Sequence, residues 1–343
     1  VTILSGPSPT AGFTYNGNQC LTGNNFCFTN TGTMGATYSW GFGDGMGTST
    51  LENPCYTYTT AGTYTVTQNV ILSGCTATAT LLVIVYAMPT ATVTGVNLTC
   101  FGVCNGSVNL TPSGVSPFSY LWSNGATTQD LTGLCAGTYS VTLTSANGCM
   151  FMTSQVITQP VVLNAAAAGV NATCFGLCNG SASTTTTGGT GSYTYSWNDP
   201  LFQTGATATG LCAGSFIATI TDGNGCTDTA AVIITQPLVL NATAAGVNAT
   251  CFGLCNGSAT ATTTGGTGTY TYSWNDPLFQ TNVTATGLCA GSFIATVTDV
   301  NGCTDTAAVA ITQPTALVSN AAGLSTHVSA PAMALPQPLQ QEA

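Results

Sequence analysis

Short runs of alternating apolar and polar residues, separated by glycine and asparagine, recur along most of the chain. Between residues 161 and 237 these runs read SYTYSW, SFIATITD and TAAVIITQ, with NG or GG pairs between them. A two-residue period places alternate side chains on opposite faces of a β-strand, and Asn-Gly and Gly-Gly pairs favour tight turns. We find no 3.6-residue apolar stripe of the kind that marks a helix. The pattern predicts antiparallel β-sandwiches.

Internal repeats organise the chain. The words VNLTCFGVCNGS at 96–107 and VNATCFGLCNGS at 170–181 and 247–258 each lead through Y-x-W, GLCAG and NGC to a closing I-T-Q-P. The repeat from Cys100 to Cys174 is three positions shorter than the repeat from Cys174 to Cys251. The three missing residues fall between Cys104 and Cys135, so we place the length change in the loop region around Trp122.

These repeats set the predicted domain boundaries. We expect an N-terminal strand and linker at 1–7, a different β-sandwich at 8–86, repeats at 87–160, 161–237 and 238–314, and a Pro/Ala/Gln-rich tail at 315–343. Units of about 75 residues with about seven strands suit an immunoglobulin-like fold. The proline that closes each repeat stiffens the junction. The prediction is an all-β chain of four tandem immunoglobulin-like β-sandwiches, strung into a semi-rigid rod.

Composition excludes several functions. The chain has no Lys or Arg, ten acidic residues and a net charge of −10. Binding to nucleic acid or insertion into an anionic membrane surface is therefore not expected, because no cation is present to displace counterions from phosphate. His327 is the only histidine, so most general bases and oxyanion clamps are missing. We expect no enzymatic activity, no catalytic residue and no cofactor.

Sixteen cysteines divide into four per domain. An even number within each folding unit predicts two local disulfides per domain and an oxidising compartment. Of three possible connectivities, we disfavour the one that pairs the neighbours of a C-x3-C run, which are about 13 Å apart when extended, beyond the ~7 Å that a disulfide spans. Metal binding through four thiolates is an alternative, but the spacing is not a clean zinc pattern.

We expect a nested scheme, in which each disulfide contributes roughly 3–4 kcal/mol through loop closure. The predicted pairs are Cys20 with Cys75, Cys27 with Cys55, Cys100 with Cys149, Cys104 with Cys135, Cys174 with Cys226, Cys178 with Cys212, Cys251 with Cys303, and Cys255 with Cys289.

Four tryptophans each close a Y-x-W strand: Trp40, Trp122, Trp197 and Trp274. One tryptophan at the same strand position in every domain favours a core residue packed on the disulfides over an exposed carbohydrate platform. Asp44 lies in a G-D-G word and is expected to form a turn by accepting bonds from its own backbone. Two pairs of acids, Asp222 with Asp228 and Asp299 with Asp305, are weak calcium candidates.

Two families resemble parts of this sequence. The segment YSWGFGDGMGTSTLENPCYTYTTAGTY at 38–64 is similar to the PKD (polycystic kidney disease) domain signature, through Trp40, Phe42, Gly43, Asp44, Gly45, Tyr58, Gly62 and Tyr64. The three later units resemble the SprB repeat of large surface adhesins in gliding bacteria, through CNGS, Y-x-W, L-x-G-L-C-A-G and D-x-N-G-C-T. The resemblance implies β-sandwich modules of cell-surface and secreted proteins without catalysis.

The SprB resemblance also implies sugar attachment. Asp228-Thr229-Ala230 and Asp305-Thr306-Ala307 look like the D-[ST]-apolar acceptor for O-glycosylation in bacteria that carry these repeats, which makes Thr229 and Thr306 glycosylation candidates. The first repeat departs from its siblings, because Ser145-Ala146-Asn147 replaces T-D-x-N and Met150-Phe151 replaces Thr-Asp. A calcium or sugar role is therefore not expected there.

We interpret the chain as a non-enzymatic extracellular structural protein of the bacterial surface, a protomer whose partners are copies of itself in a filament. Either end of the chain could add a strand to an exposed sheet edge of a neighbour, and a head-to-tail contact of this kind that does not close produces a filament. The alternative is the stalk of a surface adhesin that binds polysaccharide or other surfaces.

Overall fold

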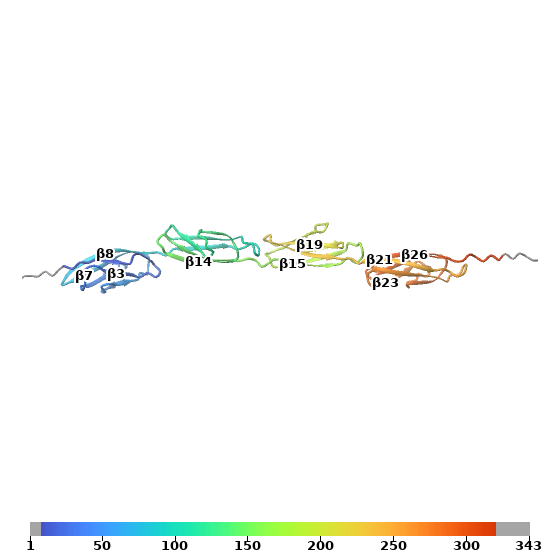
Figure 1. Cartoon of the computed structure of the whole chain (residues 1–343), viewed down its shortest axis with the longest axis horizontal. Helices are drawn as coiled ribbons and strands as arrows, with labels where there is room; N and C mark the ends of the chain where they lie inside the picture. The colour runs from blue at the N-terminus through green and yellow to red at the C-terminus, as the bar shows by residue number, and fades with distance from the viewer. Residues whose placement is uncertain (1–7, 320–343) are drawn as a thin grey trace, which may run out of the picture. The chain divides into compact units, whose positions relative to one another are not determined.

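The computed structural model describes residues 8–319, and the elements assigned within this range are strands and turns (Figure 1). The chain separates into two compact units. The first holds the described residues up to Ala168 together with Ser183–Thr207 and Ile217–Ala231, and the second holds Gly169–Ala182, Ala208–Phe216 and the described residues from Val232 on. The search of residues 8–319 for a helix long and apolar enough to cross a membrane finds none.

Residues 8–86 form two sheets from eight strands. One sheet has the order β1-β3-β6 and the other β2-β8-β7-β4-β5. The strands are β1 Phe13–Tyr15, β2 Gln19–Cys20, β3 Phe26–Asn30, β4 Thr37–Gly41, β5 Thr48–Ser49, β6 Cys55–Tyr56, β7 Gly62–Leu72 and β8 Cys75–Tyr86. All neighbouring strands are antiparallel except β2, which pairs in parallel with the end of β8 so that Cys20 lies opposite Tyr86.

Each of the three repeats contributes two three-stranded sheets. In residues 87–160 the orders are β12-β10-β9 and β11-β13-β14. The strands are β9 Thr90–Val96, β10 Gly106–Ser113, β11 Ser119–Trp122, β12 Leu131–Leu134, β13 Gly137–Thr144 and β14 Met150–Ile157.

The next two repeats follow the same plan. Their sheets have the orders β15-β16-β18, β17-β19-β20, β21-β22-β24 and β23-β25-β26. The strands are β15 Asn164–Val170, β16 Gly180–Thr187, β17 Thr194–Trp197, β18 Thr207–Leu211, β19 Gly214–Thr221, β20 Thr227–Ile234, β21 Leu238–Val247, β22 Gly257–Gly266, β23 Tyr270–Trp274, β24 Thr284–Leu288, β25 Gly291–Asp299 and β26 Thr304–Ile311. The described strands therefore fall within the predicted domain ranges, and the all-β immunoglobulin-like prediction is confirmed.

Alternation along the strands decides which side chains enter the core. In β25 the side chains of Phe293, Ala295 and Val297 are buried, and the residues between them face outward or are half-buried. The core of the last repeat combines four small alanines with larger side chains: Ala259, Ala261, Ala285 and Ala295 pack with Trp274, Leu288, Phe293 and Ile311.

All four tryptophans are core residues, as predicted, with side chains no more than 2% exposed. Each indole N–H is also satisfied by a backbone carbonyl, for example that of Gly205 at 3.0 Å from Nε1 of Trp197. The three-residue length change lies on both sides of Trp122. One residue is missing between Cys104 and Trp122, relative to Cys178 and Trp197, and two are missing after the tryptophan.

Each domain has two poles, which we define by the direction of the chain. The N-terminal pole is where the first strand begins, and the C-terminal pole is where the last strand ends. In the last repeat, Ala242 N near the start of β21 donates to Asp305 Oδ2 at 2.7 Å, and Ala249 N beyond its end donates to Thr312 O at 2.9 Å. The first and last strands therefore run in the same direction. The final hairpin lies at the N-terminal pole and the C-x3-C loop at the C-terminal pole.

We predict that Trp197→Ala lowers the stability of the chain by about 3–5 kcal/mol, because it removes a fully buried aromatic side chain and leaves a cavity. Leu201→Ala is the matched control, since Leu201 is 75% exposed, and it should change stability by less than about 0.5 kcal/mol. Urea unfolding followed by circular dichroism measures both. Equal effects of the two variants would contradict the core assignment.

Candidate functional site

Seven disulfides join fourteen of the cysteines in residues 8–319. Four short ones coincide with the predicted inner pairs: Cys27–Cys55, Cys104–Cys135, Cys178–Cys212 and Cys255–Cys289. The outer pairs are different. The structure joins Cys20 to Cys149, Cys100 to Cys226 and Cys174 to Cys303, and leaves Cys75 and Cys251 unpaired within the described range.

The predicted outer pairs, and with them the expectation of two disulfides inside every domain, are therefore wrong. The incorrect pairs are Cys20 with Cys75, Cys100 with Cys149, Cys174 with Cys226, and Cys251 with Cys303. The reason is the two poles. Cys100 follows β9 at the C-terminal pole, whereas Cys149 precedes β14 at the N-terminal pole, and the eight residues of β14 separate these poles by about 26 Å. A disulfide needs Cα atoms within about 7 Å, so six of the eight outer cysteines bond to an adjacent domain, and Cys75 and Cys251 are unpaired within residues 8–319.

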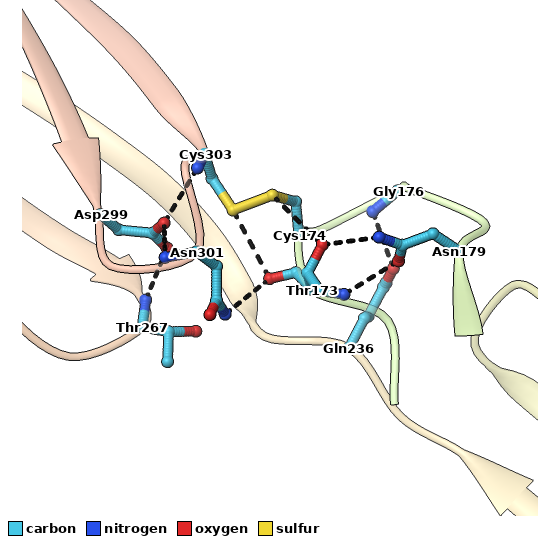
Figure 2. Close-up of a disulfide and its surroundings, with 9 residues drawn as sticks. All are labelled: Thr173, Cys174, Gly176, Asn179, Gln236, Thr267, Asp299, Asn301 and Cys303. Carbon is cyan, nitrogen blue, oxygen red and sulfur yellow. Dashed lines mark hydrogen bonds between the residues drawn. A yellow bond between two sulfur atoms is a disulfide. The ribbon is translucent and has the colours of Figure 1, made fainter. Parts of the chain in front are cut away.

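Figure 2 shows one of these interdomain disulfides, Cys174–Cys303, whose Cα atoms are 5.7 Å apart. Beside it, the Asn301 Nδ2 group donates to the carbonyl oxygen of Thr173 at 3.0 Å, and Cys303 Sγ lies 3.5 Å from the same oxygen. The carbonyl oxygen of Thr173, the residue before the C-x3-C run, thus accepts a hydrogen bond from the asparagine amide and also contacts the sulfur of the neighbouring hairpin. We call this arrangement of loop, hairpin and disulfide a joint.

The loop side of this joint is held by its own domain. Thr173 and Asn179 exchange two hydrogen bonds, Thr173 N to Asn179 Oδ1 at 3.0 Å and Asn179 Nδ2 to Thr173 Oγ1 at 2.8 Å. Gly176 N donates to Gln236 Oε1 at 2.7 Å, which ties the loop to the segment that leaves the last strand.

The hairpin side of the joint is held by Asp299. Its Oδ1 accepts from the backbone N–H groups of Asn301 and Cys303, both at 2.9 Å, and its Oδ2 accepts from Thr267 N at 2.9 Å. Gly302 has φ of 82°, a left-handed conformation that favours glycine and lets the chain turn back into β26. The NGC word therefore presents the cysteine and the asparagine amide on the same side of a fixed turn.

The joint at Cys100–Cys226 repeats this geometry. Its Cα atoms are also 5.7 Å apart, Asn224 Nδ2 donates to Thr99 O at 2.9 Å, and Gly102 N donates to Gln159 Oε1 at 3.0 Å. Asp222 accepts from Asn224 N and Cys226 N at 2.9 Å and from Thr190 N at 2.8 Å. Because the same contacts recur, the joint is a regular feature of the repeat.

The first joint, Cys20–Cys149, differs from the other two. Its Cα separation is 5.6 Å, but Ser145 stands in place of the hairpin aspartate and Cys20 lies in a short strand beside Tyr86. No hydrogen bond of the Asn147 side chain is present among the described residues. A joint therefore forms without the asparagine-to-carbonyl bond.

Desolvation tends to raise the pKa of Asp222, but hydrogen bonds from the backbone N–H groups of Cys226, Thr190 and Asn224 outweigh it and hold the pKa below its ordinary value. Desolvation acts in the same direction on Asp199 and Asp276, and hydrogen bonds from Gln203 and Gln280 hold the pKa of each low. These carboxylates are satisfied by N–H groups in a chain that has no Lys or Arg.

The calcium candidates are placed as hydrogen-bond acceptors. Asp228 Oδ2 accepts from Ala165 N and Asp305 Oδ2 from Ala242 N, both at 2.7 Å, which fastens the first strand of each repeat to the last. In residues 8–319 no cluster of three or more His, Cys, Asp or Glu side chains could hold a metal ion. Calcium binding at Asp222, Asp228, Asp299 and Asp305 stays a prediction.

Asp44 forms a turn, as predicted. Its Oδ1 accepts from Met46 N and Gly47 N at 3.0 Å, and its Oδ2 accepts from the Tyr56 hydroxyl. This last bond, with desolvation, raises the pKa of Tyr56 to about 12. The glycosylation candidates Thr229 and Thr306 are exposed on β20 and β26, and their modification stays a prediction.

Sequence reasoning missed Thr99, Thr173, Asn224 and Asn301, the residues that build the joints. The words T-C-F-G and N-G-C that contain them were visible in every repeat, but nothing in the words indicates that they meet across two domains. A groove of about 410 Å³ runs beside the Cys174–Cys303 joint, lined by Phe175, Leu177, Val239 and Leu240.

We predict that mass mapping of the unreduced protein finds a Cys174–Cys303 peptide and a Cys100–Cys226 peptide. Trypsin has no cleavage site in this sequence, so chymotrypsin and pepsin are the suitable proteases. The inner pair Cys178–Cys212 is the internal control, because it is common to both schemes. Recovery of Cys174 linked to Cys226 would show that the domains are closed individually.

Acid should destabilise the chain, because four aspartates, Asp44, Asp199, Asp222 and Asp276, have pKa values lowered by folding. Below about pH 4, the ordinary pKa range of aspartate, the unfolded chain binds more protons than the folded one, so stability falls as pH drops toward the folded-state values. Urea midpoints measured from pH 7 to pH 2 test this. Asp222→Asn should lower the midpoint at pH 7 and flatten the acid dependence. Asp130→Asn, whose carboxylate accepts one backbone N–H, from Leu110 at 2.9 Å, is the control with the smaller effect.

Comparison with known families identifies both parts of the chain. Residues 7–85 match the family model of the PKD domain, and residues 92–127, 166–202 and 243–279 match that of the SprB repeat. No curated protein matches the sequence.

Solved structures show immunoglobulin-like neighbours of low sequence identity. The chain is similar to the I-band fragment I67–I69 from titin, with 10% identity, a TM-score of 0.31, and coverage of 67% of this chain and 96% of that one. It is also similar to three N-terminal domains of the bacteriophage RB49 Hoc protein, with 12% identity, a TM-score of 0.31, and coverage of 66% and 100%. A fragment of intimin matches with 15% identity, a TM-score of 0.33, and coverage of 46% and 67%.

The two family matches lie inside the ranges 8–86 and 87–314 to within one residue, and the strands described above fill those ranges. PKD domains and SprB repeats indicate a secreted or cell-surface protein, and the disulfides fit an extracellular location. The chain contains a PKD domain followed by three SprB repeats.

Proposed function

We propose that this chain is a non-enzymatic structural protein of the bacterial cell surface, a tension-bearing protomer of an extracellular filament. The observation that carries the proposal is the staggered set of joints, which gives the chain a second covalent connection between consecutive domains. We expect no catalysis at the joints, because the carboxylates of Asp222 and Asp299 already accept hydrogen bonds from backbone N–H groups.

The joints shorten the covalent path through the molecule. From Cys20 the path crosses to Cys149, follows the backbone through β14 and β15 to Cys174, and crosses to Cys303. With about 25 residues of backbone at ~3.5 Å each, this path reaches about 10 nm. The direct backbone between the same two ends has about 280 residues and would reach about 100 nm. Tension is therefore carried by a small part of the chain.

That small part has little slack. Most of the backbone from Cys149 to Cys174 belongs to β14 and β15, whose strands are already extended. The Cys100–Cys226 joint adds a parallel route between the same two cysteines, through the inner disulfides Cys104–Cys135 and Cys178–Cys212. Sandwiches between the joints are bypassed, so a pull along the chain does not unravel them.

A filament needs contact between copies, and the strand-exchange hypothesis assigns that contact to the ends of the chain. Residues 1–7 and most of the tail at 315–343 lie outside the described residues. The hypothesis remains part of the proposal, supported by the edge strands that end each three-stranded sheet of the repeats.

A polysaccharide-binding adhesin stalk is the second candidate. The observation that favours it is an exposed phenylalanine at the same loop position in each repeat, Phe101, Phe175 and Phe252, which are 53%, 56% and 60% exposed. Aromatic faces of this kind stack on sugars, and two of them line grooves beside the joints. The buried tryptophans do not contribute to such a surface.

We predict that single-molecule stretching of the oxidised chain releases almost no hidden length between Cys20 and Cys303, and that reduction then releases about 90 nm, the difference between the two path lengths. Removing one joint with Cys174→Ser and Cys303→Ser redirects the shortest path through the Cys100–Cys226 joint and the Cys104–Cys135 and Cys255–Cys289 disulfides. That path has about 60 residues of backbone, so the variant should release about 13 nm without reduction. Release of tens of nanometres from the oxidised wild type would reject a tension-bearing role.

A further inference from the structure

The series of joints is incomplete at both ends. Each joint pairs a cysteine at the C-terminal pole of one domain with the hairpin cysteine of the next domain. In the described residues, the exposed Cys251 is a C-terminal-pole cysteine without a hairpin partner, and the exposed Cys75 is a hairpin cysteine without a C-terminal-pole partner. The two unpaired residues are therefore complementary halves of one joint.

The loop half at Cys251 has the same framework as the loop at Cys174. Thr250 N donates to Asn256 Oδ1 at 3.0 Å, Asn256 Nδ2 donates to Thr250 Oγ1 at 2.7 Å, and Gly253 N donates to Gln313 Oε1 at 2.7 Å. Each bond has its counterpart around Cys174. The carbonyl oxygen of Thr250 receives no donor within residues 8–319, whereas that of Thr173 receives Asn301.

The hairpin half at Cys75 also has the geometry that a joint requires. Cys75 is the first residue of its domain's final strand, directly after a turn at Ser73 and Gly74 with φ of 51° and 85°. Cys149, Cys226 and Cys303 likewise lie directly after the turn of the last hairpin. Cys75 begins the twelve-residue β8 and Cys20 lies opposite its last residue, Tyr86, so the two cysteines are about 36 Å apart at opposite poles.

The hairpin at Cys75 differs from the hairpins of the second and third repeats at one position that makes a hydrogen bond in their joints. The turn before Cys75 carries Ser73 where the second and third repeats carry asparagine, so the amide bond to the threonine carbonyl is absent. The Cys20–Cys149 joint forms without that bond, which shows that the disulfide does not depend on it.

We propose that Cys251 of one chain forms a disulfide with Cys75 of a second copy of this chain, and that this bond continues the series of joints from protomer to protomer. The inference rests on the proposed function, since it names the contact by which filament protomers join. The contact is between two different surfaces, loop and hairpin, so each added chain leaves one free loop and one free hairpin at the ends, and the series extends in one direction.

The bond requires an external oxidant, a low-molecular-weight disulfide such as oxidised glutathione. The thiolate of Cys251 attacks that disulfide and releases one glutathione thiolate, and the thiolate of Cys75 then attacks the Cys251 sulfur and releases the second. Two protein thiols lose two protons and two electrons, and one oxidised glutathione becomes two reduced molecules. A covalent bond also resists the mutual repulsion of chains that each carry a net charge of −10.

The test uses full-length chains with their seven other disulfides intact, in a glutathione redox buffer. Cys75→Ser retains only the Cys251 thiol, and Cys251→Ser retains only the Cys75 thiol. Wild type should form a ladder of covalent oligomers on a non-reducing gel, and an equal mixture of the two variants should stop at a dimer. Each variant alone should form at least tenfold less dimer, and mass mapping of the mixture should recover a Cys75–Cys251 peptide.

Several results would overturn the proposal. Dimers that form equally well from one variant alone would indicate unspecific oxidation, and a mixture that stays monomeric would indicate that the two halves do not meet. Electron microscopy of the double variant Cys75→Ser/Cys251→Ser separates this inference from the proposed function. Filaments that keep their number and length without these two thiols would overturn the inter-chain disulfide and leave the filament standing.

Discussion

The position of two cysteines at opposite poles of each domain governs the architecture. A sandwich of this size keeps its C-x3-C loop and its final hairpin one strand length apart, so the outer cysteines cannot satisfy each other. Six of them bond across a domain boundary instead, where the hairpin of the next domain places its cysteine at a normal Cα separation. The tension path and the unpaired cysteines at the two ends both follow from this single constraint.

A chain without lysine or arginine must stabilise its buried carboxylates by hydrogen bonds in place of ion pairs. Here the backbone provides the donors. Asp222 and Asp299 each collect three N–H groups within one turn and its neighbouring loop, and in doing so fix the hairpin that carries the joint cysteine. The hydrogen bonds that stabilise the buried carboxylates of Asp222 and Asp299 thus also position the disulfide cysteines Cys226 and Cys303.

Local pattern was sufficient to predict the strands, the presence of three repeats and the tryptophan core, because alternation and repeat spacing are properties of neighbouring residues. The inner disulfides could also be foreseen, since Cys104 and Cys135 lie within one domain. The outer pairs could not. Four cysteines per domain satisfy a closed scheme and a staggered scheme equally well, and the choice depends on which pole each cysteine occupies. That depends on the direction of the first and last strands, which the sequence does not state.

The staggered pairing also has a consequence for how the molecule is made. During synthesis Cys100 emerges well before Cys226, and its neighbour Cys149 is available in the meantime. Once the sandwich has folded, the length of β14 keeps Cys100 and Cys149 apart. The folded domain therefore prevents a Cys100–Cys149 disulfide, and Cys100 stays available for the hairpin cysteine of the next domain. In a chain whose domains fold in order from first to last, the most recently folded domain therefore carries the unpaired thiol at its C-terminal pole.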